Sequence, residues 1–221
     1  MIIVAGGTGT RMGSDVPKQF LLLAGEPLLM HTIRAFQQAC PDAAIIVPLP
    51  AGEFARWEEL RQGHGFGIPH QVVAGGPTRF QSVKNALSVL PDVGIVAIHD
   101  GARPLVSSGL IRRAFAAAEA DGNAVPAVTV MESMRETKEG RSHPVDRSGY
   151  RLIQTPQVFL LADAKPAYLQ EYRREFTDDA TVMESAGYEI RLIEGETGNI
   201  KITTPEDMVI AQALMTRPFQ R

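Results

Sequence analysis

Cysteine, long apolar runs and a strong excess of one charge are all scarce in this 221-residue chain. The chain holds one cysteine, Cys40, which excludes an internal disulfide. No apolar run is long enough for a membrane span or a signal peptide, so we expect no membrane partner and a cytoplasmic location. The formal net charge of −3 argues against nucleic acid as the main partner, so any anion site must concentrate charge locally.

Three signatures of other enzyme classes are also missing. A Walker loop needs a lysine directly after its last glycine, but Ser14 follows Gly13. A dinucleotide fingerprint that starts at Gly7 and Gly9 would need a third glycine where Met12 stands, which makes a hydride-transfer enzyme a weak alternative. The chain also lacks a Gly-x-Ser-x-Gly elbow, so we expect no covalent catalysis by a serine of that type.

The apolar pattern predicts one α/β domain that spans residues 1–221. Short apolar runs alternate with amphipathic stretches, which predicts strands at 2–4, 44–48, 70–73, 94–98, 124–130 and 190–193. The predicted helices are 28–38, 52–61, 79–90, 107–121, 161–175, 178–185 and 204–215. This rhythm is typical of a three-layer, mostly parallel, Rossmann-like sheet with helices on both faces and ligands beyond the carboxyl ends of the strands.

A glycine-rich loop with two cations, Arg11 and Lys18, follows the first predicted strand. Glycines let consecutive backbone N–H groups point at anionic oxygens, and the cations add full charges. An ordinary turn needs neither this many glycines nor paired cations. We therefore predict a polyphosphate site formed by Arg11, Lys18 and the loop residues Ala5, Gly6, Gly7, Thr8 and Gly9.

A second glycine-rich turn follows the third predicted strand and leads into a helix. It contains Gly75, and Arg79 and Ser82 stand in the first turn of the helix. N–H and hydroxyl donors at such a turn would lie beside the same crevice. The alternative is that Ser82 is an ordinary helix residue, because serine and glycine are common near helix starts.

Charged residues follow two later strands. Asp100 ends a buried strand, and a carboxylate beside a polyphosphate suits Mg²⁺, which fills its remaining positions with phosphate oxygens and water. The alternative is that Asp100 only pairs with Arg103 to shape the turn. No cysteine or second histidine lies near His99 in the sequence to form a zinc site, so His99 stays unassigned. Lys201, on the segment before the last helix, is the one lysine there without an evident structural role, and the alternative is a solvated surface lysine.

Residues 131–154 interrupt the strand and helix rhythm. This segment is polar and has too little apolar periodicity to build a core of its own. Strand character near its end predicts an extended β-arm that packs on a second subunit, which makes the protein a homodimer. A surface insertion is the alternative. After the arm, Thr204 and Asp207 form an acidic variant of a capping box that predicts the start of the last helix.

Together these motifs resemble one family, the 2-C-methyl-D-erythritol 4-phosphate cytidylyltransferases. The resemblance spans nearly the whole chain, and its motifs come in the family's order. They are Ala5-Gly6-Gly7-x-Gly9-x-Arg11-Met12, Pro17-Lys18-Gln19, Gly75-Gly76-x-x-Arg79-x-x-Ser82-Val83, His99-Asp100-Gly101-Ala102-Arg103-Pro104, Val145-Asp146-Arg147, Thr155-Pro156-Gln157 and Asn199-Ile200-Lys201-Ile202-Thr203-x-Pro205-Glu206-Asp207.

The resemblance implies a Mg²⁺-dependent transfer of CMP from CTP to the phosphate of methylerythritol phosphate, which gives a CDP-alcohol and pyrophosphate. It implies that Arg11 and Lys18 stabilise the transition state and that Arg147 and Lys201 hold the attacking phosphate. It also implies that Asp100 binds the metal and that Ser133 and Thr155 contact the acceptor. The residues implied to contact the nucleotide are Ala5, Gly6, Gly7, Thr8, Gly9, Gly75, Arg79, Ser82, Asp100 and Ala102.

Two positions depart from the family pattern. Gly101 replaces an alanine, and Ser133 replaces the more frequent threonine, which keeps a hydroxyl and loses a methyl group. Two alternatives to the methylerythritol phosphate enzyme stay open. One is a ribitol 5-phosphate cytidylyltransferase of the same superfamily, since related polyol phosphates differ by little. The other is a nucleotide-binding regulatory module without catalysis, although a mere binder needs no second anion site.

Overall fold

A computed structural model describes residues 1–7 and 16–216. Within them, the main sheet has eight strands in the order β10-β7-β11-β6-β1-β4-β5, with β12 beside β7. The strands are β1 (Ile2–Val4), β4 (Ile46–Leu49), β5 (Gln71–Ala74), β6 (Ile95–Asp100), β7 (Asn123–Thr129), β10 (Arg151–Ile153), β11 (Gln157–Leu160) and β12 (Leu192–Glu194). Strands β5, β4, β1 and β6 run parallel to one another, whereas β11 is antiparallel to β6 and β7.

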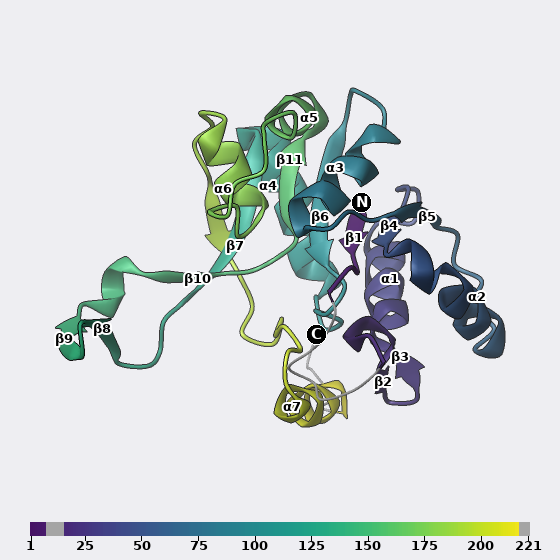
Figure 1. Cartoon of the computed structure of the whole chain (residues 1–221), viewed down its shortest axis with the longest axis horizontal. Helices are drawn as coiled ribbons and strands as arrows, with labels where there is room; N and C mark the ends of the chain where they lie inside the picture. The colour runs from purple at the N-terminus through teal and green to yellow at the C-terminus, as the bar shows by residue number, and fades with distance from the viewer. Residues whose placement is uncertain (8–15, 217–221) are drawn as a thin grey trace.

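Helices cover both faces of this sheet (Figure 1). One hydrophobic cluster joins the sheet to α1, α2 and α4, and a second joins it to α3, α5 and α6. Successive side chains of a strand point to opposite faces of the sheet, so Ile2 of β1 belongs to the second cluster and Ile3 to the first. The helices are α1 (Leu28–Ala39), α2 (Phe54–Gly63), α3 (Arg79–Ser88), α4 (Ser108–Asp121), α5 (Leu161–Ala167), α6 (Asp179–Ser185) and α7 (Pro205–Thr216). The predicted α/β class with a mostly parallel sheet is confirmed.

One prediction of secondary structure was wrong, and three short strands were missed: β2 (Leu22–Leu23), β3 (Glu26–Pro27) and β11. The helix expected at 161–175 ends at Ala167. Pro166 lies inside it, where its ring and missing N–H weaken the helix, and the mostly polar residues 171–175 offer no apolar face to bury. Strand β11, which lies in the centre of the sheet, was missed. Its four residues lead directly into α5, so that no turn residue separates the two elements in the sequence.

A β-hairpin leaves the body of the protein between β7 and β10 (Figure 1). Its strands β8 (Met134–Lys138) and β9 (Arg141–Val145) pair antiparallel, and the turn between them has positive φ at Glu139 and Gly140. The chain returns through a 3₁₀ turn, η4 (Arg147–Gly149), to the edge strand β10. No described helix combines the length and apolar character that crossing a membrane requires.

Candidate active site

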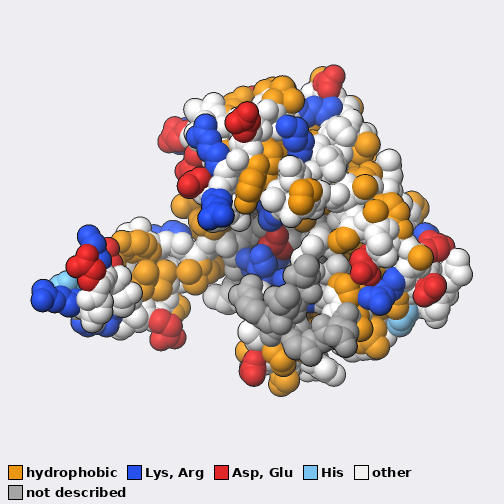
Figure 2. Space-filling model, viewed as in Figure 1, with side chains coloured by type: hydrophobic (Ala, Val, Ile, Leu, Met, Phe, Trp, Pro, Cys, Tyr) orange, Lys and Arg blue, Asp and Glu red, His pale blue; other side chains and the backbone are white. Residues whose placement is uncertain are grey.

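A cavity of about 190 Å³ lies where β1 and β6 end. Parallel pairing sets Val4 of β1 beside Asp100 of β6, so the loops that follow both strands open on the same side. Figure 2 shows acidic and basic side chains together on this face of the molecule. The described lining residues are Val4, Ala5, Gly6, Gly7, Lys18, Gln19, Gly76, Pro77, Thr78, Arg79, Ser82, Asp100, Ala102 and Lys201.

Asp100 is the acidic residue of the described cavity lining, and three cations surround it. Its Oδ2 lies 2.8 Å from Lys201 Nζ and 3.7 Å from Arg103 Nε, and its Oδ1 lies 3.4 Å from Arg79 Nε. Burial favours the neutral acid, but the three cations outweigh it and hold the pKa of Asp100 well below its ordinary value. The carboxylate is therefore ionised at neutral pH. Asp100 thus pairs with Arg103 and also lines the cavity, so the two alternatives that the sequence left open occur together.

Arg79 is held from behind by a second carboxylate. Asp179, at the start of α6, is fully buried and accepts from Arg79 Nη1 at 2.6 Å and from Nη2 at 2.7 Å. The hydroxyl of Tyr168 donates to the same carboxylate at 2.5 Å. Burial opposes the charge of Arg79, but Asp179 and Asp100 raise its pKa above the ordinary value. This bidentate geometry fixes the guanidinium plane in the cavity wall.

The glycines of the 74–78 turn allow a close approach of backbone segments. A Cβ on Gly76 would lie 2.4 Å from Gln81 Cβ, and one on Gly75 would lie 3.3 Å from the Leu49 backbone. The amide of Gly76 donates to Ser82 Oγ at 3.0 Å. Thr78 caps α3 by accepting from the Gln81 amide. Ser82 therefore shapes this wall as well as lining it.

Two lysines reach the cavity from segments far apart in the sequence. Lys18 lies in a 3₁₀ turn, η2 (Lys18–Phe20), and its Cε would be 3.3 Å from a Cβ placed on Gly7. Lys201 is held because the Ile202 amide donates to the Ala102 carbonyl at 2.8 Å. After it, α7 starts as predicted: Asp207 Oδ2 accepts from the Thr204 amide, and Thr204 Oγ1 accepts from the Asp207 amide.

The structure brings together most residues predicted for the site, but not all. Ser133 and Arg147 lie on the arm, are exposed and do not line the cavity; Arg147 donates to the Met131 carbonyl. Thr155 lies behind Asp100 and accepts from its amide at 3.1 Å. Gly75 is not a lining residue, but a Cβ at this position would lie 3.2 Å from Ser82 Oγ. Three predicted residues fall outside the described part of the chain, namely Thr8, Gly9 and Arg11.

Sequence reasoning missed the role of Asp179. From the sequence, the adjacent carboxylates Asp178 and Asp179 at the start of the predicted helix 178–185 indicate only a favourable interaction with the helix dipole. The structure divides the pair: Asp178 caps α6 by accepting from the Thr181 amide, whereas Asp179 turns to Arg79. One hundred positions separate Arg79 from Asp179, so no local pattern could have shown the contact.

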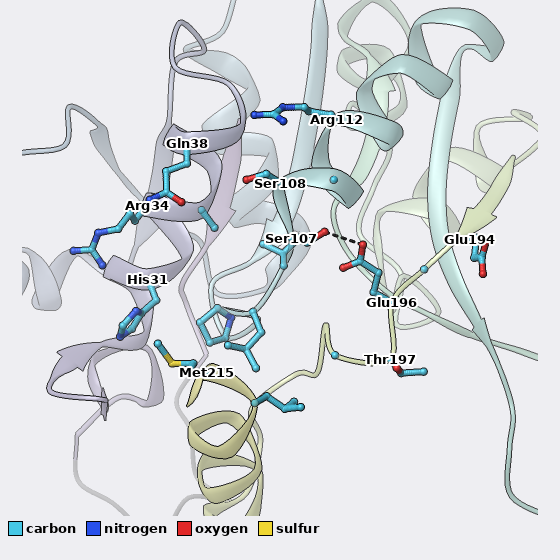
Figure 3. Close-up of a pocket in the computed structure, with 18 residues that line it drawn as sticks. His31, Arg34, Gln38, Ser107, Ser108, Arg112, Glu194, Glu196, Thr197 and Met215 are labelled. Carbon is cyan, nitrogen blue, oxygen red and sulfur yellow. Dashed lines mark hydrogen bonds between the residues drawn. The ribbon is translucent and has the colours of Figure 1, made fainter. Parts of the chain in front are cut away.

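A larger cavity, of about 1240 Å³, lies between α1, the start of α4, the loop 194–198 and the end of α7 (Figure 3). None of the residues predicted for the site is among its described lining. Two of its polar groups are already paired: Ser107 donates to Glu196 at 2.7 Å, and Arg34 binds Glu26 at 2.6 Å. The charged residues predicted for phosphate chemistry gather instead in the smaller cavity.

A sheet with a glycine-lined, cation-rich cavity at its strand ends is typical of α/β proteins that bind nucleotides. A family model described as 2-C-methyl-D-erythritol 4-phosphate cytidylyltransferase matches residues 1–217. The chain belongs to this family, which confirms the resemblance seen in the motifs. Proteins of that name from Bacteroides fragilis and Porphyromonas gingivalis are 47% and 48% identical to it, over 97% of this chain and 98% and 96% of theirs.

Solved structures agree with this assignment. The crystal structure of 2-C-methyl-D-erythritol 4-phosphate cytidylyltransferase from Thermus thermophilus superposes with a TM-score of 0.79 at 32% sequence identity. The match covers 97% of this chain and 98% of that one. The fold and the family assignment therefore rest on nearly the full length of both proteins.

Proposed function

We propose that this chain transfers CMP from CTP to 2-C-methyl-D-erythritol 4-phosphate and forms 4-diphosphocytidyl-2-C-methyl-D-erythritol and pyrophosphate, a step of non-mevalonate isoprenoid synthesis. The family match over residues 1–217 supports the substrates, and the names of the relatives favour methylerythritol phosphate over ribitol 5-phosphate. Membership of an enzyme family also argues against a regulatory module. The observation that carries the proposal is the group of three cations around Asp100 beside a glycine-lined wall.

The reaction needs charge stabilisation more than covalent chemistry. An oxygen of the acceptor phosphate forms a bond to the α-phosphorus, and the bond from that phosphorus to the pyrophosphate oxygen breaks. Negative charge moves onto the departing pyrophosphate. Lys18 lies beside Gly7 in the cavity and is suited to stabilise this charge, whereas Lys201 approaches from the other segment and is suited to hold the acceptor phosphate. Arg11 would add a further cation.

Asp100 is the candidate ligand for Mg²⁺. The ion needs few carboxylates because it keeps water and takes phosphate oxygens. The fit rests on donor chemistry: among the described lining residues Asp100 alone is acidic, and its pKa is held low enough that it is ionised. No group of three or more metal-ligating side chains occurs in the described chain, so the nucleotide would supply the other ligands. The bound ion would neutralise phosphate charge.

The arm is the candidate dimer contact. Several apolar side chains of the arm and of the adjoining sheet edge are exposed: Met131, Tyr150, Leu152, Ile153 and Leu192. Figure 2 shows hydrophobic side chains along the part of the arm nearest the body. Burial of such a patch against a second copy would stabilise a homodimer. The arm residues Ser133 and Arg147 would then complete the acceptor site of the partner. A cytoplasmic location suits an enzyme that consumes CTP.

The activity is tested by measuring pyrophosphate release with each of the four NTPs and with methylerythritol phosphate or ribitol 5-phosphate, with and without Mg²⁺. We expect turnover with CTP, methylerythritol phosphate and Mg²⁺, and loss of turnover when EDTA removes the metal. Absence of product with that pair would refute the proposed reaction. A higher kcat/KM with ribitol 5-phosphate would transfer the assignment to the alternative acceptor.

Mixed dimers test whether the arm serves the partner subunit. When Lys18→Ala and Arg147→Ala variants exchange subunits, one site of each heterodimer combines an intact body with an intact partner arm. Since half of the dimers in an equal mixture are mixed, about one quarter of wild-type activity should return if arms are shared between subunits.

A mixture of Lys18→Ala with Lys201→Ala is the control for this experiment. Both changes lie in the body, so each site of the heterodimer carries one defect and the mixture should stay inactive. Recovery in the Arg147→Ala mixture alone would support a shared arm. No recovery there, with subunit exchange verified by mass spectrometry, would mean that each arm serves its own body.

A further inference from the structure

A chain of buried hydrogen bonds runs behind Asp100. The Asp100 amide lies 3.1 Å from Thr155 Oγ1, and Thr155 Oγ1 lies 3.1 Å from His99 Nδ1. On the other side of the ring, His99 Nε2 lies 3.1 Å from the Arg103 carbonyl oxygen. His99 is fully buried and Thr155 is 4% exposed, so water does not compete for these groups.

Elementary chemistry fixes the direction of each bond. A carbonyl oxygen only accepts, so His99 Nε2 must carry the hydrogen that it shares with Arg103. The ring is fully buried, packs against the ring of Phe36 and has no carboxylate partner among its described hydrogen bonds, so it is neutral. A neutral ring with its hydrogen on Nε2 has a lone pair on Nδ1, which accepts from the Thr155 hydroxyl. The Thr155 oxygen in turn accepts from the Asp100 amide.

This arrangement uses the only hydrogen that the Thr155 hydroxyl has. A phosphate oxygen accepts hydrogen bonds, so it would need that hydrogen, which His99 already takes. Thr155 is also absent from the described lining of the cavity. In this arrangement the Thr155 hydroxyl does not donate to an acceptor phosphate, and its second lone pair is left to accept from a donor such as an acceptor hydroxyl.

We propose that Thr155 and His99 are positioning residues that fix the peptide of Asp100 and, through it, the carboxylate. The same threonine reaches the second segment of the site, because Asn199 Nδ2 donates to the Thr155 carbonyl at 2.8 Å. Asn199 lies two residues before Lys201. Thr155 thus connects the backbone that carries Asp100 to the segment that carries the lysine with which Asp100 pairs.

The state of the His99 ring can be measured without any substrate. In two-bond ¹H–¹⁵N spectra at pH 7, we expect a protonated Nε2 and an unprotonated Nδ1 for His99, with the signals assigned by their loss in His99→Gln. In Thr155→Val the Nδ1 signal should shift, because it loses its donor. A hydrogen on Nδ1 in the wild-type protein, or no shift in Thr155→Val, would overturn the proposal.

Kinetics separate positioning from direct contact, and this part rests on the proposed function. Thr155→Val should lower kcat at least tenfold, roughly the effect of a misplaced site group, and leave the KM for the acceptor within about twofold. Thr155→Ser keeps the hydroxyl and should restore most of kcat. A rise in the acceptor KM at constant kcat would instead indicate direct contact and overturn the proposal.

Thr32→Val is the matched control. Thr32 is also buried and donates to the Gly101 carbonyl at 3.0 Å, but among the described contacts it has no bond to the Asp100 amide or to His99. The Thr32→Val substitution should lower the melting temperature without shifting the His99 ring signals. If Thr155→Val does not fold, Thr155→Ser and the wild-type spectrum still decide the direction of the bonds. Absence of turnover in the wild-type protein would refute the proposed function and leave the spectroscopic test intact.

Discussion

Replacement of Asp179 by asparagine tests whether the buried pair with Arg79 holds the cavity wall. The carboxylate of Asp179 is fully buried and accepts two bonds from Arg79, at 2.6 and 2.7 Å, and one from Tyr168 at 2.5 Å. An asparagine offers one acceptor oxygen and turns an amide hydrogen toward a donor. It also leaves the guanidinium with Asp100 as its nearest described carboxylate, at 3.4 Å.

The expected cost follows from these contacts. Removing one partner of a buried ion pair costs about 3–5 kcal/mol. For a chain of this size each kcal/mol corresponds to about 2–4 °C in melting temperature, so Asp179→Asn should lower it by about 6–20 °C. We also expect a higher KM for CTP, because Arg79 is released toward Asp100 and perturbs the cavity wall.

Thermal unfolding followed by circular dichroism measures the effect, with Asp178→Asn as the control. Asp178 caps α6 and accepts from Gln157 Nε2, but it has no arginine partner among its described contacts. An asparagine can also cap a helix, so this variant should lose less than about 2 kcal/mol. Equal shifts for the two variants, or a shift below a few degrees for Asp179→Asn, would refute the reasoning.

Three further predictions concern pH, catalysis and the glycine turn. Because burial lowers the pKa of His99 to about 4, against 6.5 in the unfolded chain, the unfolded state binds the extra proton between these values. Stability should therefore fall by up to about 3 kcal/mol from pH 6.5 to 4 in denaturant titrations, and His99→Gln should remove most of this slope. Lys18→Ala should lower kcat about 10²–10³-fold in steady-state assays, with a smaller change in the KM for the acceptor; an unchanged kcat would contradict its role. Gly76→Ala should lower the melting temperature and weaken CTP binding in calorimetry, because its Cβ would lie 2.4 Å from Gln81 Cβ, and a silent variant would show that the turn can shift.

Local patterns predicted those parts of the fold in which a strand or helix carries its own signal. Strand β1 was predicted because it is a short unbroken apolar run, and helix α1 because its apolar residues repeat with the helical period. Strand β11 was not, because it is short and joins α5 without a turn. The end of α5 was predicted too late because the apolar pattern was given more weight than Pro166, which weakens the helix.

In the site, too, residues in local motifs could be predicted and long-range contacts could not. Lys18, Ser82 and Asp100 stand in loops with recognisable spacing, and the structure places them in one cavity. The bond between Arg79 and Asp179 depends on how α6 packs against the sheet, which no local spacing encodes. The direction of the Thr155 hydroxyl depends on the tautomer of His99, and therefore on a carbonyl that only the folded chain brings near.

The three cations around Asp100 have a consequence for ligand binding. In the absence of a phosphate, the carboxylate of Asp100 already pairs with Lys201, Arg79 and Arg103. This pairing offsets the electrostatic repulsion between the three cations and holds them in place. The aspartate thus acts as an internal substitute for the ligand. Entry of the proposed nucleotide would then exchange one anion for another, and the net electrostatic gain would be the difference between the two interactions. Selectivity for a polyphosphate would then depend on how much better it fits the lining cations Arg79 and Lys201 than the single carboxylate of Asp100 does.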